Sequence, residues 1–503
     1  MPENLYSFLR SGFASCPGKP FLLRDGAATI SYGDIDRLSA QVAGLLRARG
    51  VLPGERVVAQ VGKSPLALAL YLGCLRVGAI YVPLNTAYTA AELDYFLRDA
   101  RPALFIGALQ EQPDLAGLAR AADVPVWLHL EDDDRGSFAE AVAATEPDAD
   151  ITTMAPDDVV AMLYTSGTTG RSKGALLTLR NLASNAASLQ TLWGWQHDDL
   201  LLHALPIFHV HGLFVALHCA MLGGSSVLFH PRFDCAAVRA DLHRATVMMG
   251  VPTFYTRLLA DPAFGAASCH NMRLFISGSA PLLPASFEAF AERSGHRILE
   301  RYGMTEAGMI SSNPLHGERI AGTVGYALPE VRIRVVDASG RALPPGEIGE
   351  VEISGPNVFA GYWRQPEKTA AAFRPDGYLR SGDLGSLAAD GRLTLAGRAT
   401  DLIISGGYNI YPKEIENCLD ALDGIAESAV IGVPHADLGE AVLAVLVPAG
   451  EPPDADQIMA ALARRLARFK QPRRIVWLPQ LPRNSMGKVQ KQLLRERFAH
   501  SFD

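Results

Sequence analysis

Short apolar runs alternate with helical segments over the first hundred residues, and this alternation limits the possible folds more than any other feature. Strand-like runs occupy residues 56–61, 79–84 and 103–106. The segments between them, 64–77 and 92–97, have helical patterns. Strands that alternate with helices at this spacing form βαβ units, in which successive strands lie parallel. Similar alternation resumes between about residues 159 and 325. We therefore predict an α/β fold with two βα-layered, largely parallel sheets.

The second helix of the chain has a clear start and stop. Ser31 is suited to cap its N-terminus, and Asp34 stands three residues later, as in a capping box. Apolar residues then recur at a helical period until Gly50 ends the helix.

The pattern changes twice in the last third of the chain. Between residues 331 and 397, short strands alternate with turns rich in Gly, Pro and Asp, which favours a small antiparallel, barrel-like piece. Beyond residues 397–401 lies a compact unit of about a hundred residues with mixed helices and strands. We predict a large N-terminal domain, residues 1–400, and a small C-terminal α+β domain, residues 401–503.

Charge and cysteine content exclude several classes of protein. The net charge of −7 argues against a general binder of nucleic acid or of anionic membranes. The longest apolar stretch, residues 212–229, contains a histidine, two glycines and two serines, so it predicts a helix, a turn and a strand, not a membrane span. Six scattered cysteines and the lack of a signal-peptide pattern favour a reduced, cytoplasmic setting.

The segment 165–174, Thr-Ser-Gly-Thr-Thr-Gly-Arg-Ser-Lys-Gly, follows the apolar run 159–164. Its glycines allow close backbone approach, its hydroxyls and N–H groups can bind anionic oxygens, and Lys173 adds a positive charge. The spacing does not match the P-loop pattern. A flexible surface loop is the alternative, but the composition favours a phosphate site.

This segment resembles the phosphate-binding signature of the adenylate-forming superfamily, which includes acyl-CoA synthetases, aryl-CoA ligases and adenylation domains. Six further stretches resemble motifs of that superfamily and occur in the same order: residues 205–213, 277–282, 300–306, 376–385, 397–416 and 482–491. The resemblance implies the cofactors ATP, Mg²⁺ and coenzyme A. It also implies that the C-terminal domain is mobile and turns about Asp401 as its hinge.

The resemblance assigns roles to single residues. Lys488, Thr305 and Glu306 are the expected catalytic residues, and Glu306 is also the expected magnesium ligand. Tyr302 is expected to stack on adenine, and Asp383 to bind the ribose hydroxyls. The full set of residues expected to contact ATP or CoA is Thr165, Ser166, Gly167, Thr168, Thr169, Gly170, Lys173, Gly278, Ser279, Ala280, Glu300, Tyr302, Gly303, Met304, Asp383, Arg398, Gly406 and Gly407.

The acyl pocket is expected to involve His209, Ser279, Arg301 and Met304. For His209, a pocket wall and a core histidine are about equally favoured, and for His211 we favour a core histidine with satisfied hydrogen bonds. Arg301 stands where much of the superfamily has a small residue. A buried guanidinium is costly without an anion, and it matches a carboxylate bidentately. The alternative is a protein partner, but its neighbour Glu300 would point to the opposite face of a strand.

Arg301 therefore favours a short substrate with a second carboxylate. The segments 204–215, 250–258 and 299–306 resemble those of the superfamily's malonate-activating enzymes, which implies ligation of malonate, and also methylmalonate, to CoA with release of AMP and pyrophosphate. The alternatives are a CoA ligase for another small mono- or dicarboxylic acid and a stand-alone module that loads a carrier protein. A further hypothesis is that Lys488 is acylated, which would add a lysine acyltransferase and a deacylase as partners.

Overall fold

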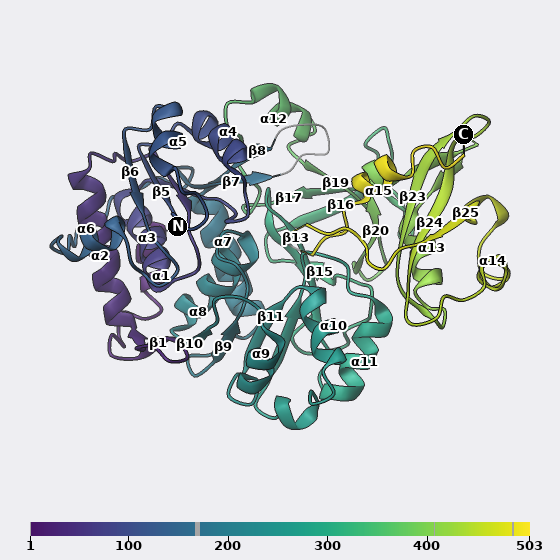
Figure 1. The fold of residues 1–503 in the computed structure, drawn as a ribbon, viewed down its shortest axis with the longest axis horizontal. Coiled ribbons are helices and arrows are strands. Elements are labelled where there is room, and N and C mark those ends of the chain that lie inside the picture. The colour runs from purple at the N-terminus through teal and green to yellow at the C-terminus, as the bar shows by residue number, and fades with distance from the viewer. Residues whose placement is uncertain (1, 166–171, 407, 485–486, 503) are drawn as a thin grey trace.

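Two large, mostly parallel sheets form the N-terminal lobe (Figure 1). The computed structural model describes residues 2–165, 172–406, 408–484 and 487–502. Within these residues, one sheet has the order β15-β14-β13-β12-β11-β9-β10-β1-β2 and the other has the order β18-β8-β7-β4-β3-β5-β6. The central strands pair in parallel, and antiparallel pairs occur toward the edges. The predicted pair of βα-layered sheets is thus confirmed.

The strands of the first sheet, in chain order, are β1 (Pro20–Leu23), β2 (Ile30–Ser31), β9 (Leu200–His203), β10 (Ser226–Phe229), β11 (Val247–Gly250), β12 (Leu274–Ser277), β13 (Leu299–Met304), β14 (Gly308–Ser312) and β15 (Tyr326–Ala327). Those of the second sheet are β3 (Arg56–Gln60), β4 (Ile80–Pro83), β5 (Leu104–Gly107), β6 (Val126–His129), β7 (Val159–Thr165), β8 (Lys173–Thr178) and β18 (Gly361–Tyr362).

The helices of this lobe are α1 (Leu5–Arg10), α2 (Tyr32–Ala48), α3 (Pro65–Val77), α4 (Ala90–Ala100), α5 (Leu115–Ala121), α6 (Ser137–Ala143), α7 (Leu179–Leu192), the π-helix η1 (His211–Leu217), α8 (His218–Gly223), α9 (Cys235–Asp241), α10 (Pro252–Ala260), the 3₁₀ turn η2 (Ala266–Cys269) and α11 (Pro284–Ser294). Every residue of α3 is buried. A helix that is apolar all round belongs in a protein interior, and α3 lies within the core that both sheets share.

Local signals placed the helix starts well. Ser31 caps α2, and the reciprocal bond from its backbone to Asp34 completes the capping box. The apolar stretch 212–229 forms η1, α8 and β10, which matches the predicted helix, turn and strand. No helix among the described residues is both long and apolar enough to cross a membrane.

The region between the lobes holds a third sheet, which is antiparallel and has the order β16-β17-β19-β20. Its elements are β16 (Arg332–Val336), β17 (Gly349–Ser354), α12 (Pro366–Ala372), β19 (Leu379–Leu387) and β20 (Leu393–Arg398). The antiparallel pairing agrees with the turn-rich sequence, although the pairing order runs in an open path.

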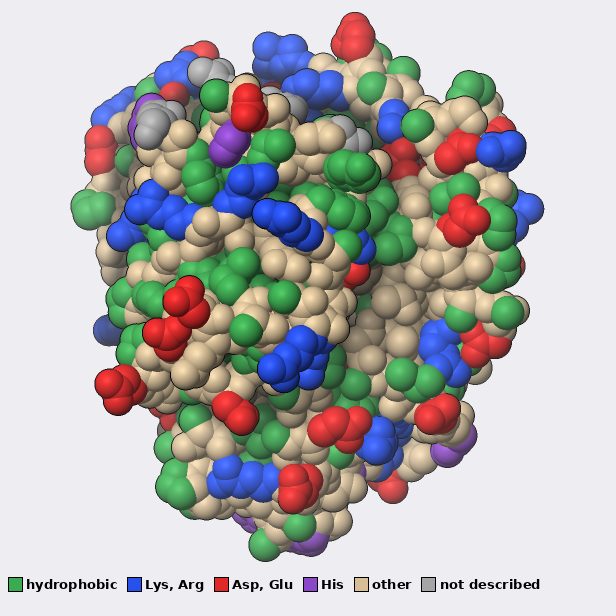
Figure 2. Space-filling model, turned by 90° about the vertical axis from the view of Figure 1, so that its right-hand side faces the viewer, with side chains coloured by type: hydrophobic (Ala, Val, Ile, Leu, Met, Phe, Trp, Pro, Cys, Tyr) green, Lys and Arg blue, Asp and Glu red, His purple; other side chains and the backbone are tan. Residues whose placement is uncertain are grey.

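The C-terminal lobe has its own sheet and its own apolar clusters, whose buried members all come from residue 403 onward. Its elements are η3 (Ala399–Asp401), β21 (Ile403–Ser405), β22 (Tyr408–Ile410), α13 (Pro412–Leu419), β23 (Ile425–His435), β24 (Gly439–Pro448), α14 (Ala455–Ala463), η4 (Arg468–Lys470), β25 (Arg474–Trp477) and α15 (Lys491–Arg497). On the face shown in Figure 2, acidic and basic side chains are interspersed around a short band of basic ones. This mixture agrees with a chain of modest net charge.

Candidate active site

The predicted phosphate loop joins β7 to β8, which pair as an antiparallel hairpin with Thr165 directly opposite Lys173. Its predicted residues Ser166, Gly167, Thr168, Thr169 and Gly170 lie outside the described part of the chain. Of the two ends that are described, Thr165 contacts Glu306 directly. Thr165 Oγ1 donates to Glu306 Oε1 at 3.4 Å.

Tyr362 joins this group from β18. Its hydroxyl donates to Glu306 Oε1 at 3.0 Å, and Lys173 Nζ lies 4.3 Å from the centre of its ring. The sequence offered no signal for Tyr362, because β18 reaches β8 only through tertiary pairing. Burial and the Glu306 carboxylate both raise the pKa of the Tyr362 hydroxyl, which therefore remains a hydrogen-bond donor.

Glu306 has the environment of a ligand for one magnesium ion. It is 8% exposed and lies in the turn between β13 and β14, with Thr305 beside it. Over the described ranges, no group of three or more His, Cys, Asp and Glu side chains could hold a metal. Mg²⁺ commonly binds through one or two carboxylates plus substrate phosphates, so a single carboxylate next to the predicted phosphate loop fits this ion.

The alternation of side chains along β13 separates Glu300 from Arg301. The Glu300 carboxylate accepts a hydrogen bond from the Gly322 N–H at 3.3 Å, and Asn313 Nδ2 donates to its backbone carbonyl. Burial raises the pKa of Glu300 to about 8. No ion pair joins the two side chains within the described residues, as the strand geometry predicted.

Arg301 is 3% exposed, and among the described residues its Nε and Nη2 atoms have no hydrogen-bond partner. A Cβ atom at Gly278 would lie 2.5 Å from its Cζ, so the glycine makes room for the guanidinium. Burial lowers the pKa of Arg301, and the nearby Tyr255 only partly opposes this effect. A buried cation without an anion is an unfavourable arrangement unless a ligand completes it.

Two histidines with unpaired ring nitrogens accompany Arg301. His211 lies 3.4 Å from the Ser279 hydroxyl through Nδ1, and burial together with the Arg301 charge holds its pKa well below the usual range. His209 and His211 each have an Nε2 atom without a partner in the described chain. His211 is therefore not the satisfied core histidine that we expected. Burial lowers the pKa of His209 to about 4, and the charge of Lys488 contributes.

Ser279 lies next to the group formed by Arg301 and His211. Ser279 has a backbone φ of 73°, a left-handed conformation that is uncommon for serine. Ala280 follows it in the loop between β12 and α11. Met304, at the end of β13, is half-buried against the core. A Cβ at Gly303 would lie only 2.4 Å from the backbone oxygen of Gly308 on the paired strand β14.

Asp383 is held by both of its oxygens. Tyr302 donates to Oδ2 at 2.5 Å, and Arg398 Nε lies 2.7 Å from Oδ1. Burial raises the pKa of Asp383, although the guanidinium of Arg398 opposes the shift. The expected ribose ligand therefore already has two partners, and the ribose would have to use its remaining lone pairs or displace them.

Lys488 projects from the C-terminal lobe toward this site. Its backbone N–H donates to Asn484 Oδ1 at 3.0 Å, and its carbonyl accepts from the Asn484 N–H. A Cβ at the preceding Gly487 would lie 3.3 Å from Thr253 Oγ1 of α10 in the N-terminal lobe. Although the residue is exposed, burial around its amine lowers the pKa of Lys488, and Arg398 adds to the effect while Asp383 opposes it.

The expected hinge residue, Asp401, lies in η3 and pairs with Arg495 Nη2 of α15 at 2.6 Å. Gly406 has a φ of 56° and donates to the Leu438 carbonyl at 2.9 Å, which joins the 403–410 hairpin to β24. Gly407 lies outside the described residues. Sequence reasoning missed the Arg495 contact, because nothing in the local pattern links residues so far apart.

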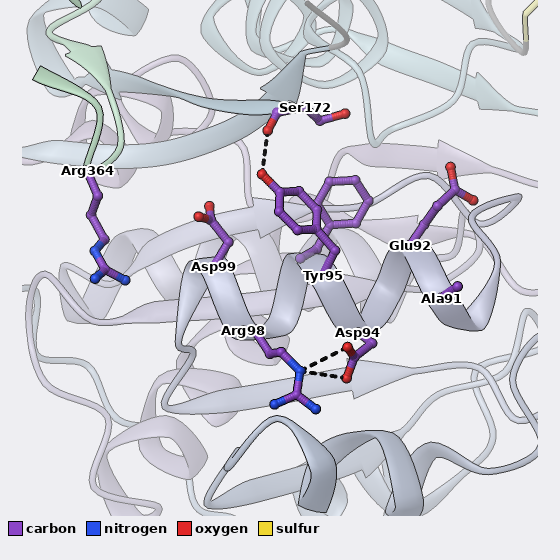
Figure 3. Close-up of a pocket in the computed structure, with 9 residues that line it drawn as sticks. Ala91, Glu92, Asp94, Tyr95, Arg98, Asp99, Ser172 and Arg364 are labelled. Atoms are coloured by element: carbon purple, nitrogen blue, oxygen red, sulfur yellow. Dashed lines mark hydrogen bonds and ion pairs between the residues drawn. The ribbon is translucent and has the colours of Figure 1, made fainter. Parts of the chain in front are cut away.

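A separate hollow of about 700 Å³ lies on the outer side of α4 (Figure 3). Tyr95 donates from this helix to the Ser172 carbonyl at 2.8 Å, and Arg98 pairs with Asp94. None of the described catalytic candidates lines this hollow.

Comparison with known proteins identifies the family. The model of the AMP-binding enzyme family matches residues 9–363, and that of the AMP-binding enzyme C-terminal domain matches residues 414–488. A feruloyl-CoA synthase of Amycolatopsis sp is 36% identical over 483 residues, which cover 95% of each chain. A mitochondrial malonate–CoA ligase of Mus musculus, ACSF3, is 36% identical over 462 residues, which cover 84% of this chain and 78% of the relative.

The fold agrees with solved structures over its whole length. The ATP-bound crystal structure of MatB from Rhodopseudomonas palustris is 47% identical, covers 100% of both chains and gives a TM-score of 0.97. The apo structure of MatB, with the same coverage, gives 0.87, so this chain is arranged more like the ATP-bound form. The chain belongs to the AMP-binding enzyme family of the adenylate-forming superfamily, and it is an AMP-forming acid–thiol ligase that joins a carboxylic acid to CoA through an acyl-adenylate.

Proposed function

We propose that the acid is malonate, with methylmalonate as a second substrate. One observation carries this proposal: the buried Arg301 guanidinium keeps two nitrogens without partners in the described chain. A second carboxylate on the substrate would supply the missing anion, and His209, His211 and Ser279 would surround it. A monocarboxylic acid would leave the charge unpaired and bind less well.

The position of Arg301 also limits the length of the acid. Arg301 and Glu306 stand only five residues apart, within and just beyond the end of one short strand. The distal carboxylate and the reacting one must therefore lie close together, which favours a three-carbon diacid. The mouse malonate–CoA ligase adds support by similarity.

In the first half-reaction, a malonate carboxylate oxygen attacks the α-phosphorus of ATP. The bond from that phosphorus to the bridging oxygen breaks, and pyrophosphate leaves. Lys488 would place positive charge between the attacking carboxylate and the α-phosphate, and Thr305 would hold a phosphate oxygen. Glu306, with Thr165 nearby, would hold the magnesium ion, whose positive charge offsets the negative charge of the phosphates. Lys173 and the loop before it would bind the departing pyrophosphate.

In the second half-reaction, the CoA sulfur attacks the acyl carbon of malonyl-adenylate. The bond from that carbon to the phosphate oxygen breaks, AMP leaves with the electron pair, and the thiol proton passes to solvent. We propose that residues 401–503 turn about Asp401 between the two steps. This motion would withdraw Lys488 and bring Gly406 and Gly407 to the tunnel for the pantetheine arm.

The test is AMP-forming turnover of the wild-type enzyme with malonate, methylmalonate, succinate, acetate and butyrate side by side. We expect malonate to have the highest kcat/KM, and methylmalonate to follow within the roughly 10–200-fold range that one methyl group can discriminate. Exchange of pyrophosphate into ATP with butyrate but none with malonate would overturn the proposal.

Similarity to the feruloyl-CoA synthase favours a second candidate, a ligase for an aromatic acid. Ferulate belongs in the same panel for this reason. Transfer of the acyl group to a phosphopantetheinyl carrier protein, with no product on free CoA, would instead indicate a carrier-loading module.

A further inference from the structure

A chain of polar contacts leads from Lys63 through His203 to Gly212, next to the proposed acyl-pocket residue His211. Lys63 follows β3, and its Nζ donates to His203 Nδ1 at 2.5 Å and to the His203 carbonyl at 2.8 Å. Nζ also lies 4.4 Å from the centre of the Phe229 ring. Among the described residues, no ion pair to a carboxylate involves Lys63. Both of these hydrogen bonds of Lys63 therefore go to His203.

His203 links Lys63 to η1. It is 1% exposed at the end of β9, and its Nε2 lies 2.9 Å from the Gly212 carbonyl. A carbonyl only accepts, so Nε2 carries the proton and Nδ1 of the neutral ring accepts from Lys63. Lys63 thus selects the tautomer of His203 that can bind Gly212.

Gly212 lies beside the pocket residues. It is the second residue of η1, and His211 is the first. A Cβ at position 212 would stand 2.0 Å from the Pro206 carbonyl, and the Leu213 N–H bonds to the His209 carbonyl at 3.0 Å. The loop that carries His209 is thus folded tightly onto the start of η1. π-Helical segments occur frequently at functional sites.

We propose that Lys63 and His203 are positioning residues for the acyl pocket. They fix the Gly212 carbonyl and thereby hold His211 near Ser279 and Arg301, with His209 in the loop that precedes it. The inference rests on the proposed role of this group in binding the acid, and neither Lys63 nor His203 touches the substrate.

The test compares four variants with the acid that the wild-type enzyme turns over best, whichever acid that is. His203→Leu and Lys63→Met break the chain at different points. His203→Gln keeps an amide nitrogen near the position of Nε2, so it can still donate to Gly212. His230→Leu is the matched control. His230 is a buried histidine directly after β10, and its side chain bonds to Asp241.

We expect KM for the acid to rise about tenfold in His203→Leu and Lys63→Met, as for one lost buried hydrogen bond, with KM for ATP unchanged. His203→Gln should restore most of the wild-type KM, and His230→Leu should leave it unchanged. A double variant with both Lys63→Met and His203→Leu should raise KM for the acid by less than the two single effects combined, because both changes interrupt one chain of contacts.

Equal changes in KM for the acid and for ATP, or no rescue by His203→Gln, would overturn the inference and indicate a purely structural role. If His203→Leu does not fold, His203→Asn replaces it, since asparagine reaches only the Nδ1 position. Because the acid panel is measured first on the wild type, an error in the proposed substrate would be seen separately.

Discussion

At the scale of single residues, the proposed specificity depends on the charge of Arg301, which has no ion-pair partner among the described residues. Arg301 is buried, and the described residues supply no carboxylate for it. The glycine at 278 removes the side chain that would otherwise collide with the guanidinium. Burial of an unpaired cation costs several kcal/mol, so the arrangement favours a ligand that brings the opposite charge.

Replacement of Arg301 should therefore separate diacids from monoacids. We expect Arg301→Met to lower kcat/KM for malonate by about a hundredfold or more, and to leave that for butyrate unchanged or raised. Steady-state kinetics with both acids gives the measurement. Arg301→Lys keeps the charge without the bidentate geometry, so its kcat/KM for malonate should fall between those of the wild type and Arg301→Met. An equal loss of kcat/KM for malonate and for butyrate would contradict the proposal that Arg301 binds a second carboxylate.

Glu300 should make stability depend on pH in a known direction. Its folded pKa of about 8 lies above the ordinary value, so its contribution is full below about pH 4.5 and is lost as the pH rises toward 8. Relative to Glu300→Gln, the wild type should lose on the order of 3 kcal/mol of unfolding free energy between pH 5 and 8.5. Urea unfolding of both proteins at the two pH values measures this difference, and a constant difference would contradict the shift.

At the scale of elements, the described residues of the segment 482–491, which we call the Lys488 arm, make several contacts with the C-terminal lobe. Asn484 bonds twice to the backbone of Lys488, and Gly487 adopts a φ of 74° that other residues rarely take. Arg483 pairs with Glu427 of β23, and Lys491 pairs with Glu416 of α13. These contacts fix the arm to the C-terminal lobe on both sides of Lys488.

Loosening this arm should slow adenylate formation selectively. We expect Glu427→Gln to reduce the rate of pyrophosphate release in the absence of CoA about fivefold, as for a partly exposed ion pair worth about 1 kcal/mol. Thioester formation from added malonyl-adenylate should not change. Asp94→Asn breaks an exposed pair on α4 and serves as the control. Equal slowing of both steps would argue against a specific role of the arm.

At the scale of the whole molecule, the C-terminal lobe approaches the N-terminal lobe at Gly487, which lies close to Thr253 of α10. This arrangement agrees better with ATP-bound MatB than with apo MatB, which supports our proposal that it is the arrangement of the first half-reaction. Arg495 holds Asp401 within the C-terminal lobe, so the proposed motion would carry the hinge side chain along.

A disulfide across this contact should separate the two steps. In the double variant Thr253→Cys and Gly487→Cys, the atoms are close enough for a bond, since a Cβ at 487 would lie 3.3 Å from Thr253 Oγ1. We expect the oxidised protein to release pyrophosphate but to form almost no CoA thioester, and reduction to restore turnover. The single variant Gly487→Cys controls for strain at position 487, and the single variant Thr253→Cys controls for the loss of the hydroxyl. Full thioester formation by the oxidised protein would contradict the proposed rotation.

Local sequence determined much of this protein. The alternation of strands and helices predicted two layered sheets, and Ser31 and Asp34 predicted a capping box. Short motifs identified Glu306, Asp383 and Lys488 as candidate site residues. These predictions depend on periodicity, on caps or on short motifs, all of which lie within a few residues of each other along the chain.

Tertiary structure alone decided which side chains meet. Tyr362 reaches Glu306, Arg495 reaches Asp401, and Lys63 reaches His203 across 56, 94 and 140 residues of sequence. The absence of a described partner for Arg301 is likewise a property of everything packed around it. Short sequence motifs thus identify the candidate reactive groups. Charge balance in the acyl pocket depends on the whole fold, because Coulombic forces and burial act through space rather than along the sequence.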